Sequence, residues 1–357
     1  MTTSPDMPAS VSVSRTGHAL HVELRRPQAL NALNLEMIEA LDRAFSLAEN
    51  DSSIALVILA GAGERAFCAG GDIRAIAQGL ASGEEIAEPF WRAEYDLLRR
   101  IEAFAKPVVV LMDAIVMGGG VGLAMHASHR VVTERTRLAM PETGIGFLPD
   151  VGATWRLPQA PDRIGDWLAL TGETVNADDA ILAGLADAMV SADRLSALRT
   201  ALSELPLGVG SAEVGAAIVS EALPAPAGRL RDARALIAAA FADGSLETIM
   251  ERLRADDRPF ARETLATLAT RSPASLYVTR HLLERGARSP DLAACLEREL
   301  ASALRIHREA DFREGVRAAL IDKDRDPRWA PWTPERAADW DAFLDDFDRR
   351  HAEGQDA

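Results

Sequence analysis

Three strand-length apolar runs constrain the fold of this chain more than any other feature. They cover residues 54–60, 107–112 and 130–133. Apolar runs without alternation indicate strands buried on both faces, as in a parallel sheet covered by helices. Parallel strands need crossover connections, and apolar residues from Ile38 to Ala48 recur at the spacing of an amphipathic helix that ends near Asn50. The sequence therefore predicts an α/β core.

The residue pattern differs between the two ends of the chain. Residues 11–24 alternate apolar and polar side chains around a turn at Gly17, which predicts a hairpin with one buried face. Beyond about residue 193 the strand-like runs stop, and Ala, Leu, Arg and Glu dominate. We expect two regions: residues 1–200 form the α/β core with the functional site, and residues 201–357 form a mostly helical region that completes the fold.

Composition excludes several classes of protein. Of 357 residues 48% are hydrophobic, enough for a sizeable core, and 54 acidic against 39 basic residues give a net charge of -15. That charge has the wrong sign for binding nucleic acid or an anionic membrane. The two cysteines, Cys68 and Cys295, are too few for a disulfide framework, which fits the reducing cytoplasm. Because residues 1–10 lack a secretion signal and no apolar run could span a bilayer, we expect a soluble cytoplasmic protein.

Two glycine motifs follow the apolar runs. The first, residues 66–74, contains Gly70-Gly71 before a helix start expected at Asp72, where backbone N–H groups can approach a ligand. The second, residues 117–123, does not fit a dinucleotide-binding motif, because the pattern demands glycine where Leu123 stands. No phosphate-binding loop lysine is present either. What remains is a glycine-lined helix start able to donate N–H groups to an oxyanion.

A third motif, residues 140–152, places Glu142 and Asp150 among apolar neighbours in a stretch rich in glycine and proline. Such carboxyl groups are expected to have raised pKa values and to serve as base, acid or nucleophile. The alternative is a helix-starting Glu and a turn Asp. His126 and His129 do not have the spacing of a zinc protease, and no G-x-S-x-G motif occurs. We therefore expect neither a metal site nor a serine nucleophile.

Taken together, the order and spacing of these three motifs resemble those of the crotonase (enoyl-CoA hydratase/isomerase) superfamily. The resemblance implies a spiral of repeated ββα units, with residues 26–34 near the CoA moiety. It also implies that the backbone N–H groups of Gly71 and Gly119 form the oxyanion hole for a thioester, and that Glu142 is catalytic. Hydratases of the superfamily have a second catalytic glutamate where this chain has Gly122, so hydration with two glutamates is disfavoured.

Within the superfamily, the chain resembles the 3-hydroxyisobutyryl-CoA hydrolases over residues 11–345. Asp150, where hydratases usually have glycine, and the C-terminal run at residues 311–324 carry this likeness. It implies hydrolysis of a 3-hydroxyacyl-CoA thioester in valine catabolism without metal or cofactor. Glu142 would be the nucleophile or general base, and Asp150 would orient the substrate hydroxyl or shuttle a proton. Glu94 matches a substrate-contacting glutamate of that subfamily; the alternative is a residue on a solvated helix face.

The resemblance also sets expectations for partners. The substrate is an acyl-CoA, and the superfamily commonly forms trimers or pairs of trimers, so we expect a homo-oligomer. Because the chain is acidic, binding of the CoA phosphates needs a local cluster of basic residues. The candidates are Arg25, Arg26, Arg74 and Lys323. Two other functions stay open: an enoyl-CoA isomerase or hydratase of the same fold, and a non-catalytic acyl-CoA-binding protein.

Overall fold

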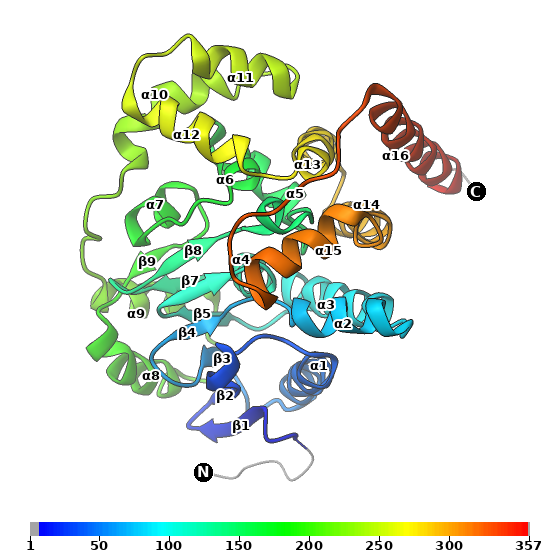
Figure 1. The fold of residues 1–357 in the computed structure, drawn as a ribbon. Helices are drawn as coiled ribbons and strands as arrows, with labels where there is room; N and C mark the ends of the chain where they lie inside the picture. Colours follow the sequence, from blue (N-terminus) through cyan, green and yellow to red (C-terminus); the bar gives the residue numbers. More distant parts are fainter. Residues whose placement is uncertain (1–6, 356–357) are drawn as a thin grey trace.

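The strands of this chain form two neighbouring sheets (Figure 1). The computed structural model describes residues 7–355, and within them a six-stranded sheet has the order β1-β2-β3-β5-β7-β9 and a three-stranded sheet the order β4-β6-β8. The strands are β1 (Val11–Thr16), β2 (Ala19–Leu24), β3 (Leu56–Gly61), β4 (Ala66–Cys68), β5 (Val108–Met112), β6 (Ile115–Met117), β7 (His129–Val132), β8 (Arg137–Ala139) and β9 (Ala188–Met189).

The elements predicted for the first half of the chain are confirmed. β1 and β2 pair antiparallel as a hairpin, whereas β2, β3, β5, β7 and β9 pair in parallel. β5 and β7 are buried along their whole length, as expected of strands covered on both faces. Helix α1 (Leu35–Asn50) ends at Asn50, and at its start the side chain of Asn34 accepts a hydrogen bond from the N–H of Met37.

The three-stranded sheet positions the three sequence motifs. β4 ends two residues before Gly70, β6 ends just before Gly118, and β8 ends before Pro141. The three strands are parallel, so their carboxyl ends lie at the same edge of the sheet. Motifs about 70 residues apart in the sequence therefore converge at one place, where α/β proteins commonly bind ligands.

Helices surround both sheets. Those of the first half are α2 (Ile73–Ser82), α3 (Ala87–Glu102), α4 (Gly119–Met125), α5 (Ala153–Arg156), α6 (Ile164–Thr171) and α7 (Ala177–Leu182). After β9 the described chain is helical: α8 (Leu195–Ser203), α9 (Ser211–Glu221), α10 (Leu230–Ala240), α11 (Leu246–Arg254), α12 (Pro259–Ala269), α13 (Pro273–Gly286), α14 (Leu292–Ile306), α15 (Ala310–Val316) and α16 (Pro334–Gln355). The predicted helical C-terminal half is thus observed.

The C-terminal helices cover the core on two sides. α8 and α9 bury Leu198, Leu202 and Ile218 against one face of the six-stranded sheet. α13, α14 and α15 pack instead near α3, α5 and the 142–145 turn, close to the site motifs (Figure 1). The division into residues 1–200 and 201–357 stays a prediction, and residue 200 itself lies within α8.

Two expectations concern the ends of the chain and its contact with membranes. The absence of a secretion signal was inferred from residues 1–10, of which residues 1–6 lie outside the described part. Among residues 7–355, none of the helices combines the length and the apolarity that crossing a bilayer would require.

Candidate active site

A cavity of about 710 Å³ opens at the carboxyl edge of the three-stranded sheet. The two glycine motifs, the 142–151 segment, α3 and the chain after α15 form its walls. Residues 28–30 and 32 also line it, as the resemblance implied for the 26–34 segment. Among the lining residues are all five that the sequence predicted for the site: Gly71, Glu94, Gly119, Glu142 and Asp150.

The two glycine segments face each other across this cavity. A Cβ atom placed on Gly70 would lie 3.4 Å from the backbone nitrogen of Gly119, and one placed on Gly119 would lie 3.5 Å from that of Gly71. Gly70 has φ of +96°, which other residues rarely adopt. Asp72 caps α2, as predicted, by accepting a hydrogen bond from the N–H of Ala75. The structure thus brings together the amides of Gly71 and Gly119.

Three carboxyl groups approach the cavity from different elements. Glu94 lies on α3, Glu142 begins a short 3-10 helix, η2 (Glu142–Ile145), and Asp150 lies just before α5. All three are buried, and Glu94 is only 2% exposed. The alternative of a solvated helix face for Glu94 is therefore wrong. Oε1 of Glu94 and Oε2 of Glu142 have no hydrogen-bond partner in the described part of the chain.

Burial and mutual repulsion raise the pKa values of these carboxyl groups. Burial is the main cause for Glu94 and Glu142, and the charge of Asp150 raises the pKa of both further. Burial also raises the pKa of Asp150, to about 7, against the hydrogen bond from Tyr95 that lowers it. Buried carboxyl groups with raised pKa values in a cavity are suited to acid–base or nucleophilic chemistry.

Tyr95 is a site residue that the sequence analysis missed. Its hydroxyl donates a 2.6 Å hydrogen bond to Oδ2 of Asp150, and both side chains are buried. Tyr95 follows Glu94 directly on α3, but no local pattern announces a contact with a residue 55 positions away. This bond fixes the direction of the Asp150 carboxyl group.

Aromatic side chains form another part of the wall that was not predicted. Phe90, Trp91 and Phe147 line the cavity, and the rings of Trp91 and Phe147 stack with centroids 5.2 Å apart. Trp91 lies three residues before Glu94, so helical spacing already placed the two on one face of α3. These rings give part of the cavity wall an apolar surface.

Gly122 has no room for a larger residue. A Cβ atom at this position would lie 2.7 Å from the Cβ of Val151, a distance that real Cβ atoms do not tolerate. Hydratases have their second glutamate at this position, but here the side chain of Val151 fills the space that a glutamate side chain would need.

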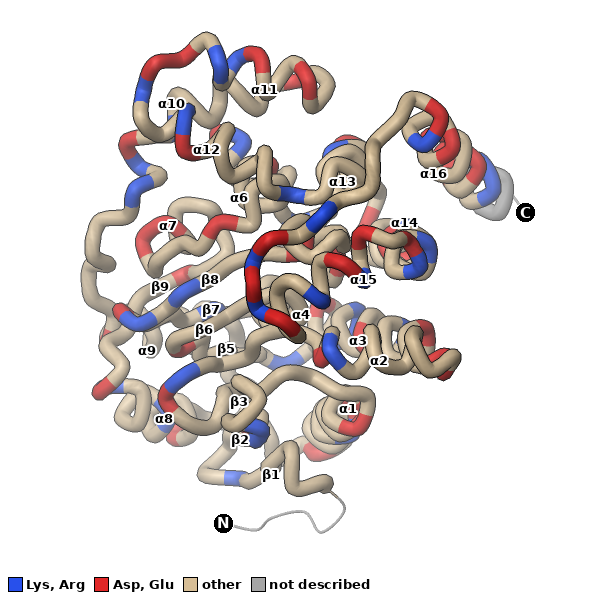
Figure 2. The backbone as a smooth tube through the Cα atoms, viewed as in Figure 1, with Lys and Arg blue, Asp and Glu red and all other residues tan. Residues whose placement is uncertain are grey.

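The basic residues proposed for CoA phosphates separate into two groups. Arg74 and Lys323 line the cavity, together with Arg65, which the sequence analysis missed. Arg25 and Arg26 are not among the described residues that line it: Arg25 faces Glu23, and Arg26 donates a 3.1 Å hydrogen bond to Asp72. Lys323 belongs to the segment after α15 in which acidic and basic residues alternate (Figure 2).

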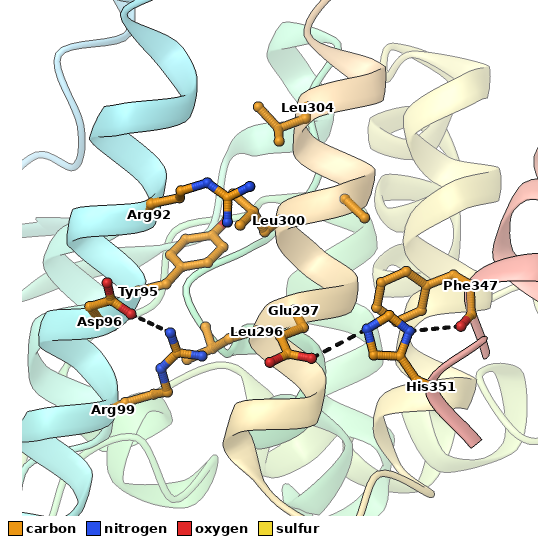
Figure 3. A pocket seen from close by; sticks show the side chains of 11 residues that line it. Arg92, Tyr95, Asp96, Arg99, Leu296, Glu297, Leu300, Leu304, Phe347 and His351 are labelled. Carbon is orange, nitrogen blue, oxygen red and sulfur yellow. Dashed lines mark hydrogen bonds and ion pairs between the residues drawn. The ribbon is translucent and has the colours of Figure 1, made fainter. Parts of the chain in front are cut away.

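A second cavity, of about 480 Å³, lies between α3, α14 and α16 (Figure 3). Its charged groups are paired: Arg92 with Glu88, Arg99 with Asp96, and His351 with Glu297. Tyr95 lines this cavity too, although its hydroxyl reaches Asp150. We call it the outer cavity and the first one the inner cavity.

A metal site was not predicted from the sequence. No group of three or more His, Cys, Asp or Glu side chains suited to a metal ion was found among the residues that the structure describes. That the protein works without metal or cofactor stays a prediction.

Comparisons with known proteins identify relatives over nearly the whole chain. A family model described as enoyl-CoA hydratase/isomerase matches residues 19–344. A protein of Xenopus tropicalis named 3-hydroxyisobutyryl-CoA hydrolase, mitochondrial, is 40% identical over 331 residues, covering 92% of this chain and 86% of that protein. The protein of the same name from Danio rerio is 41% identical over 332 residues, covering 91% and 86%.

Solved structures agree on the fold but have other names. A structure described as a carnitinyl-CoA dehydratase from Mycobacterium thermoresistibile superposes with a TM-score of 0.86 at 37% identity, covering 94% of this chain and 96% of that one. One described as an enoyl-CoA hydratase from Rhodobacter sphaeroides has a TM-score of 0.83 at 40% identity, covering 93% and 96%. The predicted crotonase-like α/β fold is thereby confirmed.

Proposed function

Because this chain belongs to the enoyl-CoA hydratase/isomerase family, we propose that it hydrolyses the thioester bond of a small 3-hydroxyacyl-CoA. The substrate is 3-hydroxyisobutyryl-CoA, water is the second reactant, and the products are 3-hydroxyisobutyrate and free CoA, as in valine degradation. One observation carries the proposal: Glu94, Glu142 and Asp150 meet in one cavity beside the paired glycine segments. The names of the relatives support the same substrate.

The oxyanion forms first in this mechanism. Attack on the thioester carbonyl places negative charge on its oxygen, and the N–H groups of Gly71 and Gly119 donate hydrogen bonds to it. Gly119 is the first residue of α4, so its N–H has no acceptor within the helix. Removal of one such donor typically lowers kcat by about 10²–10³-fold.

Glu142 supplies the nucleophile or activates it. The ionised carboxylate either attacks the carbonyl carbon, forming a mixed anhydride that water then hydrolyses, or removes a proton from an attacking water. In both routes the C–S bond breaks, the electron pair leaves with the CoA sulfur, and the thiolate takes up a proton. The unpartnered Oε2 of Glu142 is free for either step within the described residues.

Asp150 and Glu94 recognise the 3-hydroxyl group of the substrate. Asp150 is held by Tyr95, so one of its oxygens can accept the single hydrogen bond that the hydroxyl group donates. Burial raises the pKa of Glu94 and so favours a protonated carboxyl group, whose unpartnered side can donate to the hydroxyl oxygen. A site built to bind a hydroxyl group discriminates strongly against an analogue that lacks it, because its buried polar groups are then left unpaired. Preference for a 3-hydroxyacyl group follows from this arrangement.

The alternative within the same fold is an enoyl-CoA hydratase or isomerase, the kind of activity that the names of the solved structures suggest. The lack of space for a side chain at Gly122 argues against a hydratase with two glutamates. A non-catalytic acyl-CoA-binding protein is the second alternative, and the buried, unneutralised acids argue against it because they cost stability without serving binding of an anion.

CoA phosphates bind to Lys323, Arg74 and Arg65 at the rim of the inner cavity. We expect Lys323→Ala to raise KM for the CoA ester about 3- to 10-fold with kcat unchanged, since the charge acts equally on the bound substrate and the transition state. Arg25→Ala is the matched control, because Arg25 faces Glu23 and not the cavity. Steady-state kinetics at low salt measure both; an equal effect of the two variants would exclude Lys323 from the phosphate site.

The finer details of location and assembly remain proposals. We propose a homo-oligomer, as is common in the superfamily. A cytoplasmic location, which the low cysteine content fits, is likewise a proposal, whereas the relatives are named as mitochondrial.

The proposed function is tested with two substrates that differ in one hydroxyl group. Purified protein should release thiol from 3-hydroxyisobutyryl-CoA at least about 10²-fold more efficiently, in kcat/KM, than from isobutyryl-CoA. Equal efficiencies would contradict the roles of Glu94 and Asp150. Background rates with both substrates would contradict the hydrolase itself.

A further inference from the structure

The turn that carries Asp150 has an unfavourable backbone. Val151 has φ of +57° and Gly152 has φ of +82°, so two successive residues lie in the left-handed region. For a β-branched residue such as Val151 this conformation is strained and persists only when the surroundings enforce it. Asp150 precedes these residues directly, so the direction of its side chain depends on what holds the turn.

A carboxylate from the C-terminal half holds one side of the turn. Glu299, on α14, is completely buried, and its Oε2 accepts a 2.6 Å hydrogen bond from the N–H of Gly152. Its Oε1 accepts hydrogen bonds from the N–H and the hydroxyl of Thr154, at 2.9 and 2.5 Å. Three donors from residues 152–154 therefore converge on the two oxygens of one side chain.

A histidine holds the other side. Nε2 of His126 lies 2.8 Å from the carbonyl oxygen of Val151 and must donate, because a carbonyl only accepts. Burial lowers the pKa of His126 to about 4, so the ring is neutral with its proton on Nε2. His126 and Glu299 thus bind the backbone of Val151 and Gly152, the two residues in the left-handed region. Tyr95 binds the side chain of Asp150, whose direction depends on this turn.

We propose that Glu299 is a positioning residue for the hydrolysis: it fixes the 150–152 turn so that the Asp150 carboxyl group stays directed into the inner cavity. The inference rests on the proposed function, since it assumes that Asp150 acts on the substrate. Glu299 lies 149 positions after Asp150 in the sequence and acts only through the turn. Burial raises the pKa of this carboxyl group to about 8, against the hydrogen bonds from Thr154 and Gly152 that lower it.

Glu299→Gln tests the proposal. An amide has one acceptor oxygen, so its NH₂ group must face either the N–H of Gly152 or the donors of Thr154, and the hydrogen bonds on that side are lost. We expect kcat for thiol release from 3-hydroxyisobutyryl-CoA to fall about 10- to 100-fold, because misplacement of a reacting group by about 1 Å costs that much. KM should change by less than about 3-fold.

Cys295→Ala is the matched control. Cys295 lies one turn earlier on α14 and is equally buried; its thiol contacts the hydroxyl of Thr154 at 3.1 Å and Oε1 of Glu299 at 3.9 Å, but it makes no hydrogen bond to residues 150–152. Its loss perturbs the packing of the same helix and should leave kcat within about 2-fold of the wild-type value. An equal loss in both variants would mean that α14 packing, and not the carboxylate, supports the site.

Crystal structures of the two variants give a readout that does not depend on catalysis. In Glu299→Gln the 151–152 turn should leave the left-handed region and the Tyr95–Asp150 hydrogen bond should lengthen, whereas in Cys295→Ala both should persist. An unchanged turn or wild-type kcat in Glu299→Gln would overturn the proposal. If wild-type protein releases no thiol, the proposed function fails. The variant structures still decide whether Glu299 fixes the direction of the Asp150 carboxyl group.

A second variant covers the case in which Glu299→Gln does not fold. Thr154→Val removes only the hydroxyl donor and keeps both backbone donors to Glu299. We expect a smaller loss of kcat, about 2- to 5-fold, at unchanged KM. Wild-type kcat in this variant would then overturn the proposal.

Discussion

Helix α3 separates two cavities whose charged groups are arranged in opposite ways. Toward the inner cavity it presents Glu94, which is buried with two further acids and meets no cation among its close charged neighbours. Toward the outer cavity it presents Arg92 and Arg99, each exposed by more than a third and paired with an acid one turn away (Figure 3). The same helix thus carries reactive groups on one face and solvated ion pairs on the other.

The difference shows what distinguishes a site from a charged surface. Exposed ion pairs contribute roughly 0–1 kcal/mol each to stability. Buried acids that repel one another cost stability, and both burial and repulsion raise their pKa values. The acids of the inner cavity, and not the ion pairs of the outer cavity, are therefore the groups that can supply a proton or a nucleophile.

Glu142→Gln should have the largest effect. The amide can neither attack the thioester nor accept a proton, so kcat for thiol release should fall by about 10³-fold or more. Glu297→Gln, which alters an acid of the outer cavity, is the matched control and should retain wild-type activity. Quantitative thiol detection measures both variants, and substantial activity in Glu142→Gln would remove Glu142 from the chemistry.

Gly119→Ala should have the second-largest effect on activity. The added methyl group would collide with the carboxyl oxygen of Glu94 and displace either that group or the amide of residue 119. Loss of an oxyanion donor predicts a kcat lower by about 10²–10³-fold. Gly83→Ala is a control for a methyl group that meets nothing, since a Cβ atom there has no neighbour within 4 Å, although its φ of +81° costs some stability. Activity retained in Gly119→Ala would contradict the oxyanion hole.

Asp150→Asn should lower kcat about 10²-fold and yet stabilise the protein at high pH. The pKa of Asp150 is raised in the folded state, so its ionisation opposes folding increasingly as the pH rises from about 4 to about 7. The asparagine removes this penalty and still accepts the bond from Tyr95, so the free energy of unfolding should rise by about 1–3 kcal/mol at pH 8.

Denaturant unfolding of Asp150→Asn and wild type at pH 5 and pH 8 measures that change. Asp96→Asn, on the outer face of α3, is the control and should show no such trend. A stabilisation that is equal at both pH values would mean that the charge of Asp150 is not the cause.

Arg92→Ala should have the smallest effect. Arg92 is exposed and bonds only to Glu88 among its described neighbours, so stability should change by less than about 1 kcal/mol and kcat by less than 2-fold. Thermal unfolding and thiol release check this. A large loss of activity would show that the outer cavity communicates with the inner one through α3.

The local glycine and carboxylate motifs could be identified from the sequence, but the roles of Gly71, Gly119 and Glu142 came from the resemblance. These residues follow three short strands that the sequence analysis did not predict, and the carboxyl ends of those strands meet at one sheet edge. Glu94 was found through the resemblance, and helical spacing did not exclude a solvated position for it.

The contacts that were missed join residues far apart. Tyr95 meets Asp150 across 55 positions and Glu299 meets Gly152 across 147. These pairs depend on how α3 and α14 pack against the core, which periodicity and motif spacing do not determine. Arg25 and Arg26 were expected at the CoA site because of their charge. The charge of a residue does not determine the direction of its side chain, and these two contact Glu23 and Asp72.

The central claim is that the acids of the inner cavity hydrolyse a thioester and do not hydrate a double bond. The most direct test follows thiol release from 3-hydroxyisobutyryl-CoA and hydration of crotonyl-CoA with the same purified protein, beside Glu142→Ala and Asp150→Asn. We predict rapid thiol release that both variants lose, and hydration at background. Hydration of crotonyl-CoA with thiol release at background would contradict the account and favour a hydratase built on the same fold.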